Sequence, residues 1–139
     1  MGKKFTEKAE AALNRAVNLA EDFGHTYIGT EHFLLSLLYD KEACATSILS
    51  KRKIGFETLS ACIREYSGVG VKSSLTVKDI TPRGRQILES SYNNALKYGD
   101  GIIGTDHILL SLIEEKNCVA VKLLRTPSHR TMEGLTSAE

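Results

Sequence analysis

Two threonines and two acidic residues recur in this sequence at positions that suit a ligand carrying both charges. Thr6 and Thr81 each precede a run of helical periodicity, and Glu31 and Asp106 each follow a Gly-Thr pair. The first N–H groups of a helix have no intrahelical partners and suit an anion such as phosphate. A carboxylate suits a cation, above all a guanidinium, which it can hold with two hydrogen bonds. If the helix starts within a unit lie close together, Thr6 with Glu31 and Thr81 with Asp106 form two mixed-charge sites; otherwise all four residues only cap helices.

Histidine is the other residue type here that could bind a metal or take part in catalysis. His32 and His107 stand at equivalent positions early in two predicted helices, and His25 and His129 complete the set. A metal site would require ligands at i and i+4 or a nearby cysteine cluster, and the sequence has neither. We therefore predict no metal site, and expect His32 and His107 to pack or to form hydrogen bonds that steady the adjoining loop. A small enzyme with a histidine-centred site is the alternative, which loss of activity on mutating either histidine would reveal.

Residues 99–104 match the pattern G-x-G-x-x-G, but they do not predict a nucleotide site. A dinucleotide-binding fingerprint needs a strand before it, whereas a helical pattern precedes this segment. The equivalent residues 24–29 keep only the outer glycines, so both segments are predicted to be turns between helices. The chain contains no G-x-x-x-x-G-K-[ST] motif, and no Ser-His-Asp or Cys-His arrangement can be assigned with specificity. We predict no catalytic residues and no bound cofactor in this chain.

The composition is that of a globular protein rather than a disordered one. Of 139 residues, 42% are hydrophobic and 25% are charged, and the net charge of +1 argues against a broad electrostatic footprint for nucleic acid. No apolar run is long enough to span a membrane, and the N-terminus lacks the apolar stretch of a signal peptide. Cys44, Cys62 and Cys118 lie far apart, so neither a disulfide framework nor a zinc ribbon is predicted. We expect a reduced protein of the cytoplasm without nucleic-acid or membrane partners.

The chain contains one unit twice, with an offset of 75 residues. Residues 28–37 match residues 103–112 except at two positions, Glu31/Asp106 and Phe33/Ile108. Self-similarity at a fixed offset predicts a duplicated structural unit rather than one continuous pattern.

Each unit is predicted to open with a long helix. Apolar and small residues recur at helical spacing in residues 12–20 and again in residues 87–95. Thr6 and Thr81 stand where an N-cap belongs, and Pro82 occupies the favoured first helical position. Gly24 and Gly99 are predicted to end these helices.

Shorter helices are predicted to follow in each unit. Thr30 and Thr105 are expected to cap a second helix, with an acidic residue in its first turn. A third helix is predicted around residues 43–51 and 119–125, and a fourth over residues 56–66, whose counterpart should begin near Ser128. Residues 67–79 form the predicted connecting loop, where residues 69–77 carry the only, weak strand signal. The predicted fold is all-α, with about eight helices.

Four motifs give the sequence a family resemblance. They are F-T-x-x-A, G-H-x-x-I-G-T-E-H-x-L-L-x-L, T-P-R and I-G-T-D-H-I-L-L-S-L, which begin at Phe5, Gly24, Thr81 and Ile103. Together they resemble the double Clp repeat that forms the N-terminal domain of Clp-family AAA+ ATPases, and the ClpC type most of all. The resemblance implies one domain over residues 1–139, with repeat one at about 5–67, a linker at about 68–79 and repeat two at about 80–139. A pseudo-twofold axis would relate the two four-helix repeats.

The resemblance also implies a function for the chain. It would be a recognition domain for adaptor proteins and protein substrates, mounted on an ATP-dependent unfoldase ring of the bacterial cytoplasm that feeds the ClpP peptidase. ATP would then belong to the parent ring. A free-standing double-Clp-repeat adaptor or assembly factor is the alternative, although the end of the sequence inside the expected eighth helix favours a piece of a longer chain.

In the ClpC type, this domain also binds phosphoarginine, a degradation mark on proteins. The resemblance assigns two phosphoarginine pockets, Glu31 with Thr6 and Asp106 with Thr81. The second motif has Asp106 where the family usually has Glu, one methylene longer. We therefore predict that the unit with Glu31 binds more tightly than the unit with Asp106.

Overall fold

Seven α-helices make up most of the computed structural model, which describes residues 4–42 and 44–125. Repeat one supplies α1 (Glu7–Phe23), α2 (Thr30–Tyr39), α3 (Cys44–Ser50) and α4 (Phe56–Ser67). Repeat two follows the 3-10 turn η1 (Val77–Asp79) and supplies α5 (Pro82–Tyr98), α6 (Thr105–Glu114) and α7 (Val119–Arg125). The prediction of an all-α fold is confirmed. The expected eighth helix near Ser128, and His129, lie outside the described residues.

Threonine caps begin the two long helices, as predicted. The Thr6 hydroxyl accepts a hydrogen bond from the Ala9 N–H at 3.0 Å, and the Thr81 hydroxyl accepts one from the Gly84 N–H at the same distance. Such a cap contributes about 1 kcal/mol to helix stability. Pro82 occupies the first turn of α5, where the N–H it lacks would have no helical partner.

The two long helices end differently, although each is followed by a glycine. Gly24 adopts the left-handed conformation, with φ of 77°, which confirms its predicted role. Gly99 also follows the last residue of its helix, but its φ is −164°, which is extended backbone. In repeat two the left-handed residue is Gly101, with φ of 86°. The repeats therefore share the end of the helix and not the conformation of the turn.

The second helices start one residue earlier than predicted. Gly29 and Gly104 are the N-cap residues, so the prediction that Thr30 and Thr105 are caps is wrong. Each threonine is instead the first residue of its helix. The Thr30 hydroxyl has another partner, because it accepts the Ala120 N–H at 3.1 Å and thereby joins α2 to α7.

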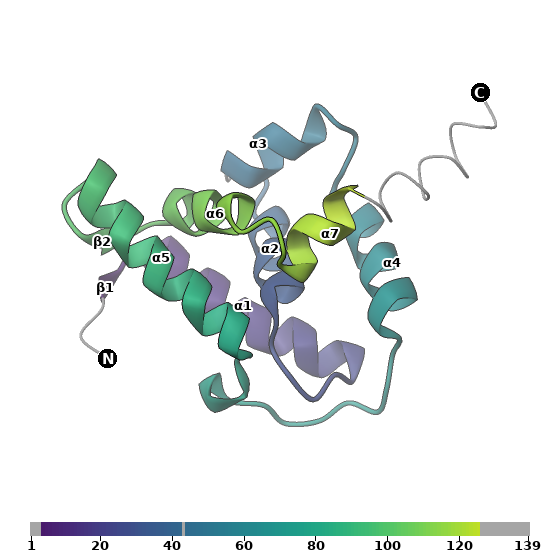
Figure 1. Ribbon diagram of the computed structural model, residues 1–139. Helices are drawn as coiled ribbons and strands as arrows, with labels where there is room; N and C mark the ends of the chain where they lie inside the picture. Colours follow the sequence, from purple (N-terminus) through teal and green to yellow (C-terminus); the bar gives the residue numbers. More distant parts are fainter. Residues whose placement is uncertain (1–3, 43, 126–139) are drawn as a thin grey trace.

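Helix α2 lies at the centre of the molecule, between α1, α6 and α7 (Figure 1). Every residue of α2 from Thr30 to Leu38 is buried, whereas α6 buries only one face. Helix α1 packs against α2, and most of the residues that α1 buries are alanines, of which Ala16 and Ala20 are 0% exposed. One continuous hydrophobic core therefore holds both repeats together.

The start of each repeat pairs with a loop of the other repeat. Strand β1 (Lys4–Phe5) runs parallel to β2 (Ile102–Ile103), and the isolated bridge between Ile28 and Ile80 is its equivalent at an offset of 75 (Figure 1). Residues 69–77, whose pattern carries a weak strand signal, form no strand: residues 69–76 are irregular and Val77 begins η1. The pairs are too short to give an alternating pattern in sequence, yet they set which ends of the repeats meet.

Candidate functional site

In the structure, the threonine of each predicted site lies near the acid of the other repeat and not near the acid of its own repeat. The Thr6 N–H donates to the carbonyl of Ile103 at 2.8 Å, and the Thr81 N–H donates to that of Ile28 at 2.9 Å. Thr6 therefore begins α1 close to the loop that leads to Asp106, while Glu31 follows the opposite end of α1. The predicted pairing of Thr6 with Glu31 and of Thr81 with Asp106 is wrong. The structure brings Glu31 together with Thr81 across the repeat boundary.

Glu31 and Thr81 share a small pocket, here called the Glu31 pocket. Its volume is about 270 Å³. It is lined by Tyr27, Gly29, Thr30, Glu31, Tyr66, Thr81, Arg83, Asn117, Cys118 and Val119. Glu31 comes from the start of α2, and Thr81 and Arg83 come from the start of α5. Tyr27 comes from the loop before α2, and Tyr66 from α4. A buried carboxylate and the N-terminal end of another helix thus face the same space.

The Glu31 carboxylate is held in place inside this pocket. Glu31 is 2% exposed, and the Tyr27 hydroxyl donates to its Oε2 at 3.0 Å. Burial raises the pKa of Glu31, and burial also raises the pKa of Tyr27 to about 12. The carboxylate folds back over Gly29, where a Cβ would collide with Oε1. The carboxylate has therefore lost much of its hydration, which strengthens its attraction to a cation that enters the pocket.

Asp106 occupies the equivalent backbone position in a much more open setting. Its side chain is 66% exposed, and its Oδ1 accepts the N–H of His107 at 3.0 Å. It also folds back over a glycine, because a Cβ on Gly104 would stand 2.6 Å from Oδ1. We call Asp106, Thr6 and Ile103 the Asp106 site.

The two equivalent histidines steady the loops before their helices, as predicted. His32 Nδ1 accepts the Gly29 N–H at 2.9 Å, and His107 Nδ1 accepts the Gly104 N–H at 2.9 Å. Both rings thus take up a backbone donor of the N-cap glycine. Among the described residues, no group of three or more His, Cys, Asp and Glu side chains is placed to hold a metal ion.

His32 belongs to a longer chain of hydrogen bonds. Among the described residues of repeat two this chain has no counterpart, because Asp100 stands where repeat one has His25. His32 Nε2 lies 2.8 Å from His25 Nδ1, and His25 Nε2 lies 2.8 Å from the Gly68 carbonyl. Because His32 Nδ1 accepts from Gly29, its Nε2 carries the proton and donates to His25, which in turn donates to Gly68. Burial lowers the pKa of His32 to about 3, which keeps this ring neutral.

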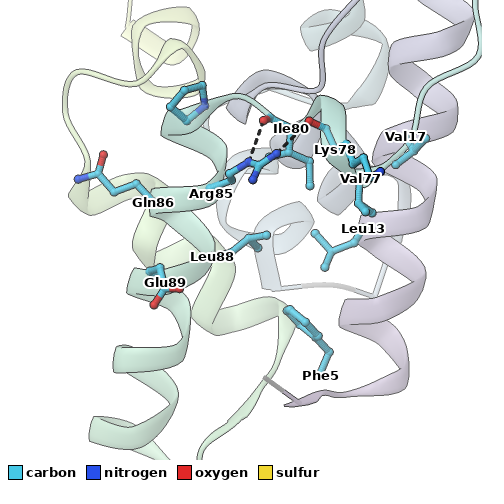
Figure 2. A pocket seen from close by; sticks show the side chains of 11 residues that line it. Phe5, Leu13, Val17, Val77, Lys78, Ile80, Arg85, Gln86, Leu88 and Glu89 are labelled. Atoms are coloured by element: carbon cyan, nitrogen blue, oxygen red, sulfur yellow. Dashed lines mark hydrogen bonds between the residues drawn. The ribbon is translucent and has the colours of Figure 1, made fainter. Parts of the chain in front are cut away.

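A second candidate site, not predicted from the sequence, is an apolar groove between α1 and α5 (Figure 2). Its volume is about 560 Å³. Leu13 and Leu88 face each other across it, and they are equivalent residues at an offset of 75, as are Phe5 and Ile80. The groove therefore lies between equivalent helices of the two repeats and is lined by equivalent residues of both. In the sequence these leucines cannot be told from core residues, because they adjoin the buried face of each helix.

The rim of this groove is polar and partly fixed. Arg85 donates to the carbonyls of Ile80 and Lys78, at 3.2 and 2.9 Å, so its guanidinium closes one end (Figure 2). Gln86 and Glu89 line the side formed by α5. A groove with an apolar floor and a mixed polar rim suits an extended or helical peptide segment.

The fold defines the chain as a duplicated helical domain. It consists of two helical repeats, and the first residues of each repeat pair with a loop of the other. The chain belongs to the family described as the Clp repeat (R) N-terminal domain, which matches residues 4–126. Within the described residues, no helix is long and apolar enough to cross a membrane.

Relatives and solved structures agree with this family. The chain is 38% identical over 121 residues to the "Negative regulator of genetic competence ClpC/MecB" of Bacillus subtilis, a match that covers 87% of this chain and 15% of that protein. It is 35% identical over 121 residues to the chaperone protein ClpB of Oceanobacillus iheyensis, again covering 87% of this chain and 15% of the relative. The N-terminal domain of the chaperone ClpD from Arabidopsis thaliana superposes with a TM-score of 0.67 at 17% identity, covering 96% of this chain and 95% of that one. The chain thus spans about 15% of the length of these two relatives.

Proposed function

We propose that this chain is the substrate- and adaptor-recognition domain of a ClpC-like ATPase, and that it binds proteins marked with phosphoarginine. The Glu31 pocket carries the proposal, because a buried carboxylate of one repeat faces the helix start of the other. The family and the ClpC relative support the class of protein. In this proposal the parent ring binds ATP in the bacterial cytoplasm, unfolds the captured protein and delivers it to ClpP.

A phosphorylated arginine side chain carries both charges that the Glu31 pocket can accept. Its guanidinium group would pair with the Glu31 carboxylate, for which planar, two-point hydrogen bonding is the favoured geometry. Its phosphoryl group would lie at the start of α5, where the Arg83 N–H and the helix dipole attract an anion. The Asp106 site would offer the same arrangement with α1, from a more exposed acid.

Titration of phosphoarginine against isotope-labelled protein tests this proposal, because amide NMR shifts read the two sites separately. We expect saturable shifts at the amides of residues 29 and 31. Binding should be lost in Glu31→Ala, and its affinity should fall about ten-fold or more in the isosteric Glu31→Gln. Asp106→Ala is the matched control and should leave the titration at Gly29 unchanged. Wild-type binding by Glu31→Ala would refute the assignment.

The apolar groove favours a second mode of recognition, the capture of apolar segments from unfolded substrates or adaptors. Its leucines come from both repeats, so a peptide lying in it would contact α1 and α5 together. Fluorescence anisotropy of a labelled apolar peptide would measure this binding. Leu13→Ser should weaken it while leaving the phosphoarginine titration at Gly29 intact, and equal peptide binding by both proteins would remove the groove from the proposal.

The same domain could serve as a free-standing adaptor of the Clp machine rather than as part of an ATPase subunit. A Walker motif downstream in the complete gene product would identify the ATPase subunit. Its absence there would identify the adaptor. Both functions would use the Glu31 pocket in the same way.

A further inference from the structure

Arg83 lines the Glu31 pocket, and its charge is held there by a neighbouring acid. Its Nη1 lies 2.6 Å from Oε2 of Glu115, which follows the end of α6. The Arg83 side chain is 42% exposed and that of Glu115 is 26% exposed, so the pair lies at the pocket's edge and not in the core. A half-exposed ion pair is a weak restraint. The guanidinium can therefore exchange its carboxylate for a more highly charged anion.

The start of α5 offers an anion few backbone donors of its own. Pro82 has no N–H, and the Gly84 N–H is already bonded to the Thr81 hydroxyl. This leaves the N–H of Arg83 in the first turn. At the start of α1 the equivalent cap leaves two N–H groups, those of Glu7 and Lys8, to bind an anion. An anion at the start of α5 therefore needs a side-chain donor more than one at the start of α1.

The same basic position exists in both repeats, but its surroundings differ. Lys8 is equivalent to Arg83, and it lies 4.0 Å from Asp40 and 3.9 Å from Glu42. In repeat two Asp40 corresponds to Glu115, while Glu42 corresponds to Asn117, which is neutral. The Arg83 side chain thus forms an ion pair with one acid, whereas the Lys8 side chain lies near two. A guanidinium can also grip a phosphoryl group with two parallel hydrogen bonds, whereas an ammonium acts as a point charge.

We infer that Arg83 is the residue by which the Glu31 pocket distinguishes phosphorylated from unmodified arginine, with Glu115 as the counter-ion that a phosphoryl group displaces. This inference rests on the proposed binding at Glu31. In it, Glu31 selects the guanidinium group, which both forms of arginine carry, and Arg83 selects the phosphoryl group, which only one carries. Removing Arg83 abolishes the preference and not the pocket.

Site-resolved NMR titrations with phosphoarginine and with arginine test the inference. Arg83→Gln should weaken phosphoarginine binding at Gly29 about ten-fold or more and leave arginine binding there unchanged. The phosphoarginine affinity of Arg83→Lys should lie between those of wild type and Arg83→Gln. Glu115→Gln should strengthen phosphoarginine binding a few-fold. Lys97→Gln, at the other end of α5, is the control for net charge. Unaltered amide spectra of α7 in each free variant would show that the fold is intact.

The possible failures are distinct. If wild-type protein shows no saturable shift at Gly29, the proposed function and this inference both fall. If wild-type protein binds and Arg83→Gln binds phosphoarginine equally well, the inference alone is overturned. An equal loss for arginine and phosphoarginine would also overturn it, because it would assign Arg83 to the general integrity of the pocket.

Discussion

Glu31 and Asp106 occupy equivalent positions, yet Glu31 is 2% exposed whereas the side chain of Asp106 is 66% exposed. Both acids fold back over an N-cap glycine whose N–H is held by a histidine. The difference comes from the surroundings. Tyr27, which donates to Glu31, corresponds to Ile102, which has no hydroxyl. A duplicated backbone can therefore place the same acid twice and still give it two electrostatic environments.

The location of the second helix explains much of this difference. Helix α2 is buried on all sides by both repeats, whereas α6 keeps one face in solvent. Glu31 thus begins a central helix and Asp106 begins a peripheral one. Burial strengthens an interaction with a bound cation, but it also costs hydration of the empty carboxylate. The Glu31 pocket is consequently expected to be the tighter site and the more sensitive to pH.

The largest expected difference between the repeats is at the glycines that end the long helices. Gly24→Ala should destabilise the domain by about 3 kcal/mol or more, because φ is 77° and the added Cβ would collide with the backbone of Gly70. Gly99→Ala should cost about 1 kcal/mol or less, since Gly99 is extended and the nearest atom to its Cβ would be the Ala95 carbonyl oxygen at 3.2 Å. Urea unfolding of the two variants measures both values. Equal losses would show that the turn at Gly24 can open.

A smaller effect is expected from acid, through His32. Its pKa in the folded state is lowered to about 3 from an ordinary value of 6.5, so unfolded protein binds the proton more readily. The stabilisation is complete above about pH 6.5 and is lost as the pH falls toward 3, which amounts to about 2 kcal/mol by pH 5. Burial of Glu31 acts in the opposite sense, because its raised pKa makes its contribution most favourable at low pH and lost as the pH rises.

The pH dependence can be assigned with variants at the two equivalent histidines. Urea unfolding of wild type, His32→Gln and His107→Gln at several pH values between 7 and 5 would give the slopes. The slope should flatten in His32→Gln and persist in His107→Gln. A wild-type slope retained in His32→Gln would place the titration elsewhere.

Much of the fold could be predicted because its signals are local. The hydroxyl of Thr6 or Thr81 caps the residues that follow it, so residue type and spacing are enough to find the helix starts. Thr30 misled because its hydroxyl is used by Ala120, 90 residues away, and the local pattern of a cap is the same in either case.

The pairing of the site residues could not be predicted from the repeat. An offset of 75 states that Thr6 is equivalent to Thr81 and Glu31 to Asp106, but not which threonine meets which acid. A duplicated sequence has the same local pattern whether the first segment of each repeat pairs with a loop of its own repeat or with a loop of the other repeat. Single backbone hydrogen bonds, such as that from the Thr81 N–H to the Ile28 carbonyl, decide the pairing. Because such bonds place no requirement on the side chains, the sequence does not reveal them.

The smallest expected effect concerns the length of the acid. Exchanging the two acids singly, as Asp106→Glu and Glu31→Asp, would separate reach from burial. Asp106→Glu should strengthen phosphoarginine binding at the Asp106 site about three-fold, because the added methylene extends the carboxylate away from the His107 N–H that it now caps. Glu31→Asp should weaken binding at the Glu31 pocket by more than that, since a shorter side chain would also lose the bond from Tyr27. Titrations read at Gly104 and Gly29 report the two sites. If Asp106→Glu binds like wild type while Glu31→Asp weakens, exposure rather than reach limits the Asp106 site. If neither exchange changes binding, the acids are helix caps and the comparison between the two sites loses its basis.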